Sequence, residues 1–149
     1  MRYGIISDML RLVLDTNILV AALRSSDGAS AELVRLMRLG KFQFLATPAL
    51  FLEYEEVLKR PEHLLAHKLS SGQVDVYLAA LALLCHPVDL HFSWRPQLRD
   101  AADEMVLEAA VNGRANAIVT FNYKDFYPAS ETFGVEILRP AEIIRKIRS

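Results

Sequence analysis

The sequence of 149 residues is poor in cysteine, in net charge and in long apolar runs, and each scarcity excludes a class of protein. The single cysteine, Cys85, excludes an internal disulfide and a multi-cysteine zinc site, which fits a reducing cytoplasm. The 17 basic and 18 acidic residues give a net charge of -1, so any basic surface must be local. No segment is long and apolar enough to span a bilayer, and we therefore expect no membrane partner.

Short apolar runs alternate with helical patterns along the chain. Strands are predicted at 10–14, 42–46, 88–92, 116–121 and 135–138, and helices at 17–23, 29–40, 48–60, 70–85, 100–112 and 140–148. This alternation favours parallel pairing, so we predict an α/β protein, a three-layer α/β/α sandwich around a five-stranded parallel sheet. Residues 1–8 are expected to be an N-terminal extension, with Met9 as an alternative start, and residues 9–149 a single domain.

Polar residues follow two of the predicted strands. Asp15 comes directly after the first strand in LRLVLDTNILV, and Asn122 and Asp125 come after the fourth in TFNYKDF. Because sites in doubly wound sheets lie beyond the carboxyl ends of the strands, we expect these side chains to meet there. No glycine-rich loop follows the first strand, which argues against a nucleotide-binding domain.

The helix predicted at 100–112 also carries carboxylates near its start. On a helical wheel Asp103 falls inside the apolar arc, whereas Glu104 and Glu108 fall on the polar side. We therefore expect Asp103 to face the sheet. No lysine or arginine of this helix shares its face.

A second acidic group lies in the helix predicted at 48–60. Glu53 and Glu55 flank opposite edges of its apolar stripe, and Glu56 faces away. Glu55 is also placed for an i,i+4 ion pair with Lys59. The wheel leaves both Glu53 and Glu55 open as site residues.

Each carboxylate also has a structural explanation. Asp15 can cap the helix that follows it, Asp100 and Asp103 can complement a helix dipole, and Asp125 can belong to a turn. Such roles do not require the acids to converge on one sheet edge, however. Converging carboxylates raise each other's pKa unless a cation neutralises them, and oxygen ligands favour Mg²⁺ or Mn²⁺. We therefore predict that a divalent metal ion partners Asp15.

The sequence resembles the PIN-domain ribonucleases in four ordered segments: LDTNILVAAL (14–23), PALFLEYEEVLKRP (48–61), LRDAADEMVLEAAVNGRANAIVTFNYKDF (98–126) and EILRPAEII (136–144). It looks most like the VapC-like toxin components of toxin–antitoxin pairs. The resemblance implies a cytoplasmic endoribonuclease that depends on Mg²⁺ or Mn²⁺. It also implies RNA as the substrate, a small antitoxin protein as a partner, and a homodimer or higher homo-oligomer.

The resemblance further implies roles for individual residues. The three catalytic acids fall on Asp15, Glu53 and Asp103, which selects Glu53 over Glu55. Further metal ligands are expected at Asp100, Asn122 and Asp125, and substrate contacts at Asn17, Arg24 and Thr120.

RNA must also be held by its phosphates, and this requires basic neighbours of the acids. Arg24 ends the helix that adjoins Asp15 and is the preferred contact. For Arg139 and Arg145, near the C-terminus, an ordinary solvated surface is the favoured interpretation. Tyr123 could stack on a base, but packing is the favoured explanation for it.

A receiver-like signalling module is one alternative function. It shares an Asp after the first strand, matched by Asp15, a Thr after the fourth, matched by Thr120, and a basic residue before proline, matched by Arg139-Pro140. Receivers need a second acid beside the first, and this chain has Thr16 there.

A non-catalytic interaction protein with the same fold is the other alternative. Ala101 and Ala102 interrupt the acidic run that the family shows, and Asn122 is a neutral ligand. Both departures weaken a second metal position, and metal binding is the property that separates this alternative from the nuclease.

Overall fold

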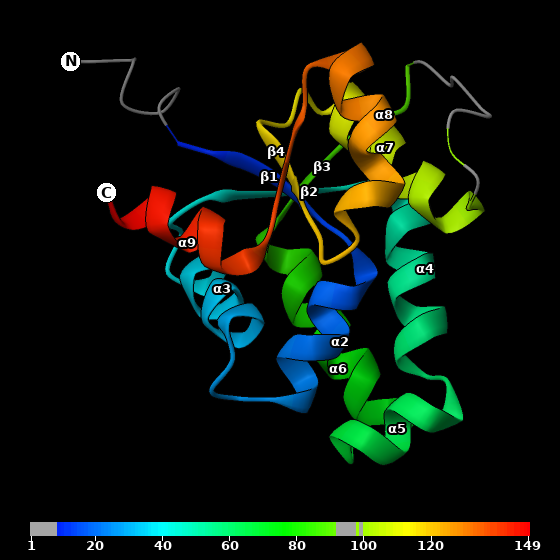
Figure 1. Cartoon of the computed structure of the whole chain (residues 1–149). Coiled ribbons are helices and arrows are strands. Elements are labelled where there is room, and N and C mark those ends of the chain that lie inside the picture. The colour runs from blue at the N-terminus through cyan, green and yellow to red at the C-terminus, as the bar shows by residue number, and fades with distance from the viewer. Residues whose placement is uncertain (1–8, 92–97, 99) are drawn as a thin grey trace.

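The computed structural model describes residues 9–91, 98 and 100–149, so the expected N-terminal extension at 1–8 lies outside the described residues. These residues build a fully parallel five-stranded sheet with helices on both faces (Figure 1). The strands are β1 (Arg11–Leu14), β2 (Gln43–Ala46), β3 (Cys85–Pro87), β4 (Ala117–Val119) and β5 (Glu136–Leu138). This confirms the predicted three-layer α/β sandwich.

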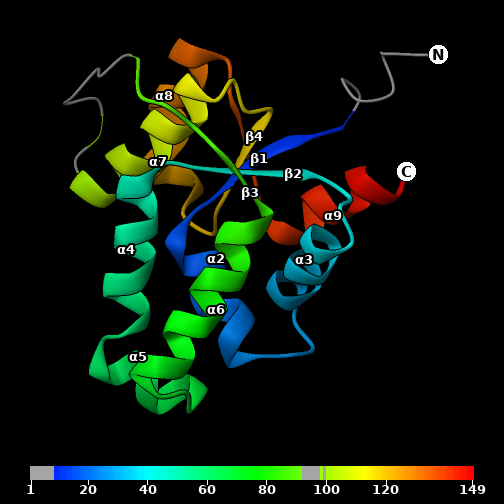
Figure 2. The ribbon, with the colours of Figure 1, turned by 180° about the vertical axis from the view of Figure 1, so that it is seen from behind.

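The helices lie in two groups on either side of the sheet. They are α2 (Thr16–Arg24), α3 (Ala29–Arg38), α4 (Pro48–Leu58), α5 (Pro61–His67), α6 (Ser71–Leu84), α7 (Ala101–Asn112), α8 (Tyr123–Phe133) and α9 (Pro140–Arg148). Helices α7 and α8 cover one face, whereas α2, α3 and α9 pack together on the other (Figures 1 and 2). Among the described residues, none of these helices combines the length and apolar composition needed to cross a membrane.

The strand order β3-β2-β1-β4-β5 places a topological switch point between β1 and β4. From β1 the chain moves outward to β2 and β3, and it then crosses back to β4 on the other side of β1. Such a switch point opens a crevice at the carboxyl ends of the two strands. Receiver domains have the order 2-1-3-4-5. The receiver-like alternative is therefore wrong, because the third strand here lies at an edge of the sheet.

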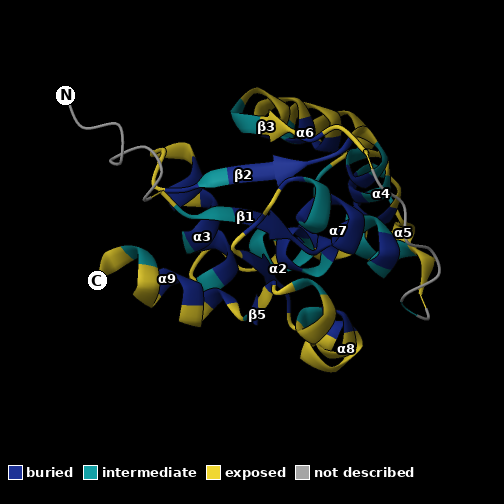
Figure 3. Ribbon diagram, turned by 90° about the horizontal axis from the view of Figure 1, so that it is seen from above, coloured by how far each residue is buried: buried dark blue, intermediate teal, exposed yellow. Residues whose placement is uncertain are grey.

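The core is built on strands buried from both sides. Figure 3 shows β1 and β2 as buried elements, with exposed residues on the outer sides of the helices. The largest fully buried side chains are those of Tyr54, Phe44 and Phe126. A strand covered on both faces offers no solvent to a charged group at its end, which sets the environment of Asp15.

The third strand lies earlier in the sequence than predicted. Residues 85–87 pair with β2, and the pairing closes with a hydrogen bond from the Val88 amide to the Ala46 carbonyl (3.0 Å). Residues 88–91 of the predicted strand are not extended into the sheet, and residue 92 lies outside the described residues. Helix α6 passes into β3 without a loop, so the apolar run through Cys85 conceals the boundary.

Two further boundaries differ from the prediction. Strand β4 spans 117–119 rather than 116–121, so Thr120 and Phe121 follow the strand instead of belonging to it. Residues 123–133, for which no helix was predicted, form α8 despite Pro128 inside it. Helix α4 begins at Pro48 as predicted, and Thr47 caps it, since the Thr47 hydroxyl accepts a hydrogen bond from the Leu50 amide (3.1 Å).

Gly113 allows α7 to end close against the sheet. A Cβ at this position would lie 2.8 Å from the Ala109 carbonyl oxygen and 2.9 Å from Val88 Cγ2. We expect Gly113→Ala to lower the free energy of unfolding by about 1–3 kcal/mol, because such overpacking shifts backbone. Urea denaturation measures the change. Gly72→Ala is the matched control, since its added methyl group meets only Ser70 Oγ at 3.9 Å. Equal stability of the two variants would contradict this close packing.

Candidate active site

The carboxylate of Asp15 is buried at the carboxyl end of β1, with 6% of the residue exposed. Its Oδ1 accepts a hydrogen bond from the Thr16 amide (2.8 Å), which caps α2 as predicted, and its Oδ2 accepts one from the Thr120 hydroxyl (2.6 Å). Within the described part of the chain, no lysine or arginine pairs with it. Burial, the largest influence, raises the pKa of Asp15 above its usual value, and the two hydrogen bonds oppose that rise.

Thr120 joins the ends of the two central strands. Its side chain is fully buried, and while its hydroxyl donates to Asp15, the same oxygen accepts a hydrogen bond from the Asn122 amide (2.9 Å). The Asp15 amide in turn donates to the Val119 carbonyl (2.9 Å). These three bonds fix the orientation of the Asp15 carboxylate relative to β4. The Asn122 side chain lies on the exposed side of this turn and does not cap α8.

Tyr54 ties α4 to the same strand end. Its buried hydroxyl donates a hydrogen bond to the Leu14 carbonyl (2.6 Å), one residue before Asp15. The neighbouring Glu53 is partly buried, and burial followed by the negative charge of Glu56 raises the pKa of Glu53. The charge of Asp15 adds to the rise, which shows that the two carboxylates share one electrostatic neighbourhood.

The other glutamates of α4 are engaged elsewhere. Glu55 forms the predicted i,i+4 ion pair with Lys59 (2.7 Å), and Glu56, which is exposed as predicted, pairs with Arg60 (2.7 Å). Glu53 forms no ion pair within the described residues, although the charge of Arg60 lowers its pKa slightly against the larger effects. Of the two glutamates that the wheel left open, Glu53 is thus the one without a cationic partner.

Asp103 carries the most perturbed carboxylate on α7. Burial first, and then the charges of Asp15, Asp100 and Asp125, raise the pKa of Asp103 from 3.8 to about 7. Asp100 is the N-cap of this helix, since its Oδ1 accepts a hydrogen bond from the Ala102 amide (2.8 Å). Repulsion of this kind means that the four aspartates lie near one another at the carboxyl edge of the sheet.

The predicted orientation of two other acids on α7 is wrong. Glu104 and Glu108 are only 3% and 4% exposed, so they are more buried than Asp103. Glu104 accepts a hydrogen bond from the Leu98 amide. Helix α7 packs against β1, β2 and β4 and also against α4 and α8, so more than one of its sides is covered. A helical wheel with a single apolar arc does not predict the burial of a helix that is covered on several sides.

The donor atoms at this edge are all oxygens, which fit a hard divalent cation. Among the described residues, no lysine or arginine forms an ion pair with Asp15, Glu53 or Asp103 that would offset their repulsion. In the ranges 9–91 and 100–149, together with residue 98, no three His, Cys, Asp or Glu side chains are close enough to hold an ion. The acids therefore share a neighbourhood without forming a finished cage, and an ion would draw them closer.

The sequence between β1 and the start of α8 decides the family. The sequence model of the PIN-domain family matches residues 11–124, more than half of the chain. The chain belongs to the PIN-domain family. PIN domains are generally nucleases, so the acid-rich edge is the candidate active site of this one. A comparison with curated proteins finds no match.

A cavity of about 380 Å³ in this PIN domain brings together both predicted substrate contacts of α2. Asn17 and Arg24 line it with Phe121, which directly follows Thr120. Asn17 Oδ1 is buried and has no hydrogen-bond partner among the described residues, and Arg24 is exposed. Phe121 was not among the predicted site residues, because it falls within the strand predicted at 116–121. The signal that could have found it is the polar Asn122, which already marks the turn.

The pKa of Asp103 provides a direct test of this neighbourhood. In the metal-free protein we expect the carboxyl carbon of Asp103 to titrate in an NMR experiment with a midpoint near pH 7. Asp15→Asn should lower that midpoint, because it removes the largest like-charge repulsion. Because the pKa of Asp103 is higher in the folded protein, ionisation of this carboxyl disfavours the folded state. The free energy of unfolding should therefore fall as the pH rises from about 4 to about 7. A midpoint near 4 would mean that the acids do not meet.

Proposed function

We propose that this PIN domain is a metal-dependent endoribonuclease that cleaves RNA phosphodiester bonds. The observation that carries the proposal is the Asp15 carboxylate, which is buried, oriented by Thr120 and unpaired with any cation of the described chain. A buried carboxylate without a counter-ion is costly. Its repulsion by Asp103 increases that cost, and a bound divalent cation would offset both.

The residues that would hold the ion are Asp15, Glu53 and Asp103, with Asp100, Asn122 and Asp125 as further ligands. When bound, Mg²⁺ or Mn²⁺ would lower the pKa of a water molecule and stabilise charge on the phosphate. Thr120 keeps Asp15 in one orientation by donating to Oδ2. Tyr54 holds α4, and with it Glu53, against the end of β1. Asp103 is protonated in part near neutral pH and would lose its proton on binding the cation.

Substrate contacts in this proposal come from the cavity beside α2. Arg24 is exposed there and is suited to a phosphate, while Asn17 offers an amide whose oxygen has no protein partner within the described residues. Phe121, which lines this cavity, directly follows Thr120, whose hydroxyl donates to Asp15. An RNA strand held by Arg24 would therefore bring its backbone to the acids. The repulsion between the acids and the phosphates would be offset by the charge of Arg24 and by the bound metal ion.

The biological role that we propose is that of a toxin of a toxin–antitoxin pair, acting on cytoplasmic RNA and bound by a small antitoxin protein. This role rests on the resemblance of the four sequence segments to VapC-like toxins. A homodimer or higher homo-oligomer is part of the proposal. It is supported by the outer side of α6, where Val76 and Leu83 are 71% and 89% exposed.

A non-catalytic interaction protein with this fold remains the second candidate. Two observations favour it: no three acidic, histidine or cysteine side chains within the described ranges form a preformed cage, and Ala102 and Asn122 replace acids. Mn²⁺ binding distinguishes the nuclease from the interaction protein, because a non-catalytic protein does not need carboxylates arranged to bind a metal ion.

Removal of either central aspartate tests the nuclease. We expect Asp15→Asn and Asp103→Asn each to lower Mn²⁺-dependent cleavage of a labelled RNA by at least about a hundredfold, since even indirect support of a metal ligand is worth up to that factor. The loss should occur without unfolding, because both changes remove charge repulsion. Gel analysis of the RNA and circular dichroism of the variants measure the two effects. Full activity of both variants would refute the assignment.

The choice between glutamates on α4 is tested by a matched pair. Glu53→Gln should lose cleavage at least about tenfold, whereas Glu56→Gln should stay within about twofold of wild type, because Glu56 is exposed and paired with Arg60. Both variants lose one negative charge on the same helix. Equal losses in cleavage rate would show that Glu53 has no special role.

A further inference from the structure

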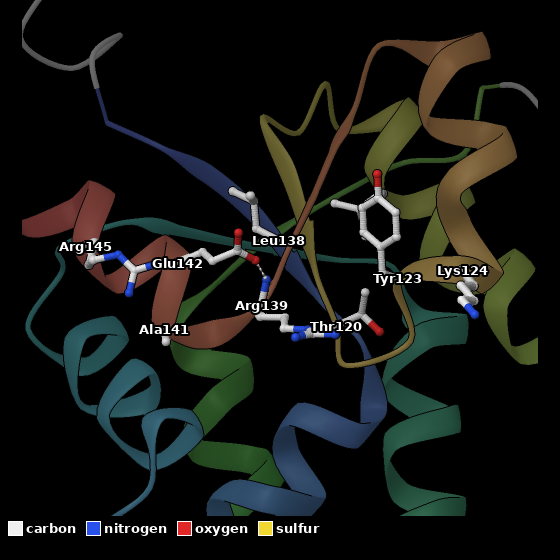
Figure 4. Close-up of a pocket in the computed structure, with 9 residues that line it drawn as sticks. Thr120, Tyr123, Lys124, Leu138, Arg139, Ala141, Glu142 and Arg145 are labelled. Carbon is white, nitrogen blue, oxygen red and sulfur yellow. Dashed lines mark hydrogen bonds between the residues drawn. The ribbon is translucent and has the colours of Figure 1, made fainter.

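A second pocket, distinct from the Arg24 cavity, lies between the β4–α8 and β5–α9 connections and is lined in part by Thr120. It has a volume of about 580 Å³, within the range of sites for small ligands. Figure 4 shows side chains from both connections around it, with Arg139 running toward Thr120 and Lys124 beyond Thr120 on the opposite side. Residues about twenty positions apart in the sequence thus form one concave surface at the carboxyl ends of β4 and β5.

The pocket has an excess of positive charge. Lys124, Arg139 and Arg145 line it and are exposed, and the one acid among its lining residues is Glu142. The Glu142 carboxylate already accepts a hydrogen bond from the Arg139 amide (2.9 Å; Figure 4). None of the three cationic side chains forms an ion pair with a residue in the described ranges. In a chain of net charge -1, such a local group of unpaired cations is suited to an anionic ligand.

An aromatic ring stands at the same pocket. Tyr123 is 43% exposed and lies against Tyr127, with 5.5 Å between the ring centroids. Sites for single-stranded nucleic acid combine cations that follow the phosphates with aromatic rings on which bases stack. A carboxylate-bearing protein segment would use the cations but would gain less from an exposed ring. The combination therefore favours a nucleotide over an acidic peptide.

The pocket shares Thr120 with the candidate active site. Thr120 lines it, and the hydroxyl of the same residue donates to Asp15 Oδ2 (2.6 Å). A strand seated there would have its next phosphate close to the acids. Arg139 and Arg145 lie beyond residue 124, where the match to the PIN-domain model ends, so they belong to a part of this chain that the family model does not cover.

We infer that this pocket binds one nucleotide of the RNA strand next to the cleaved bond, with phosphates of the strand on Arg139, Arg145 and Lys124 and the base against Tyr123. The inference rests on the proposed nuclease function for the identity of the strand. It adds a second point of attachment, so that RNA is held on both sides of the acids.

The test is a binding titration without cleavage. Fluorescence anisotropy with a labelled single-stranded oligoribonucleotide of about 12 nucleotides, inside the range that single-stranded sites cover, is recorded in EDTA over a series of salt concentrations. For Arg139→Gln/Arg145→Gln we expect affinity to fall about tenfold, because the variant cannot form the charge-assisted hydrogen bonds to phosphate. The slope of log K against log salt should fall by about 0.7 for each phosphate that the variant no longer neutralises.

The matched control removes the same charge elsewhere. Lys41→Gln/Lys146→Gln changes two exposed lysines that lie outside the pocket, one of them on α9, and its affinity should stay within about twofold of wild type. Tyr123→Ala should weaken RNA binding with an unchanged salt slope, and that loss should vanish with a strand of the same length that lacks bases.

The outcomes separate the pocket from the nuclease. If the double arginine variant keeps wild-type affinity and slope, or if the control loses as much, the inference is overturned, and RNA cleavage by wild type with Mn²⁺ would still support the nuclease. Pocket-dependent binding by a wild-type protein that never cleaves RNA would support the pocket and reject the proposed hydrolysis. Loss of binding to an acidic protein alone, with RNA binding unchanged, also overturns the inference.

Discussion

The burial of one carboxylate, with no paired cation among the described residues, is the constraint on which this structure depends. Asp15 lies at the end of a strand covered on both faces, and within the described ranges its charge is stabilised by hydrogen bonds from Thr16 and Thr120. Desolvation outweighs these bonds, so its pKa is raised. Burial, and then the charge of Asp15, raise the pKa of the neighbouring Asp103 to about 7. Stability would be greater without these acids, which is the usual relation between a fold and the site it carries.

The strand order explains why the cluster has substrate-sized space on two sides. The switch point between β1 and β4 directs their following segments apart, so α2 leaves one side of the crevice and α8 the other. Phe121 lines the cavity with Arg24, and the preceding residue, Thr120, lines the pocket with Arg139. One short turn after β4 therefore faces both spaces and also orients Asp15. A chain of nearly zero net charge thereby places cations around an acidic centre.

Local rules were sufficient to predict much of the fold and part of the site. The start of α4 at Pro48, the ion pair of Glu55 with Lys59 and the place of Asp15 after a buried strand follow from residues within a few positions of one another. The parallel sheet follows from the alternation of strands and helices. These predictions needed no knowledge of how distant segments pack.

The failures arose where distant segments meet. Glu104 is buried because α7 is covered on several sides, and β3 begins at Cys85 because α6 ends directly against the sheet. The pocket at Arg139 exists only because two connections far apart in sequence face each other, so its cations looked like ordinary surface. The choice of Glu53 as a candidate site residue came from the family resemblance, and the structure adds that Glu55 is already paired with Lys59.

Calorimetric titration of the metal-free protein with Mn²⁺ tests the central claim most directly. Because the pKa of Asp103 is raised from 3.8 to about 7, binding near neutral pH should release protons from this carboxyl, measured as a dependence of the heat on the buffer's ionisation enthalpy. Asp15→Asn should bind far more weakly, and Asp103→Asn should lose the released proton. A wild-type protein that takes up no Mn²⁺, or takes it up equally well without Asp15, would contradict the account.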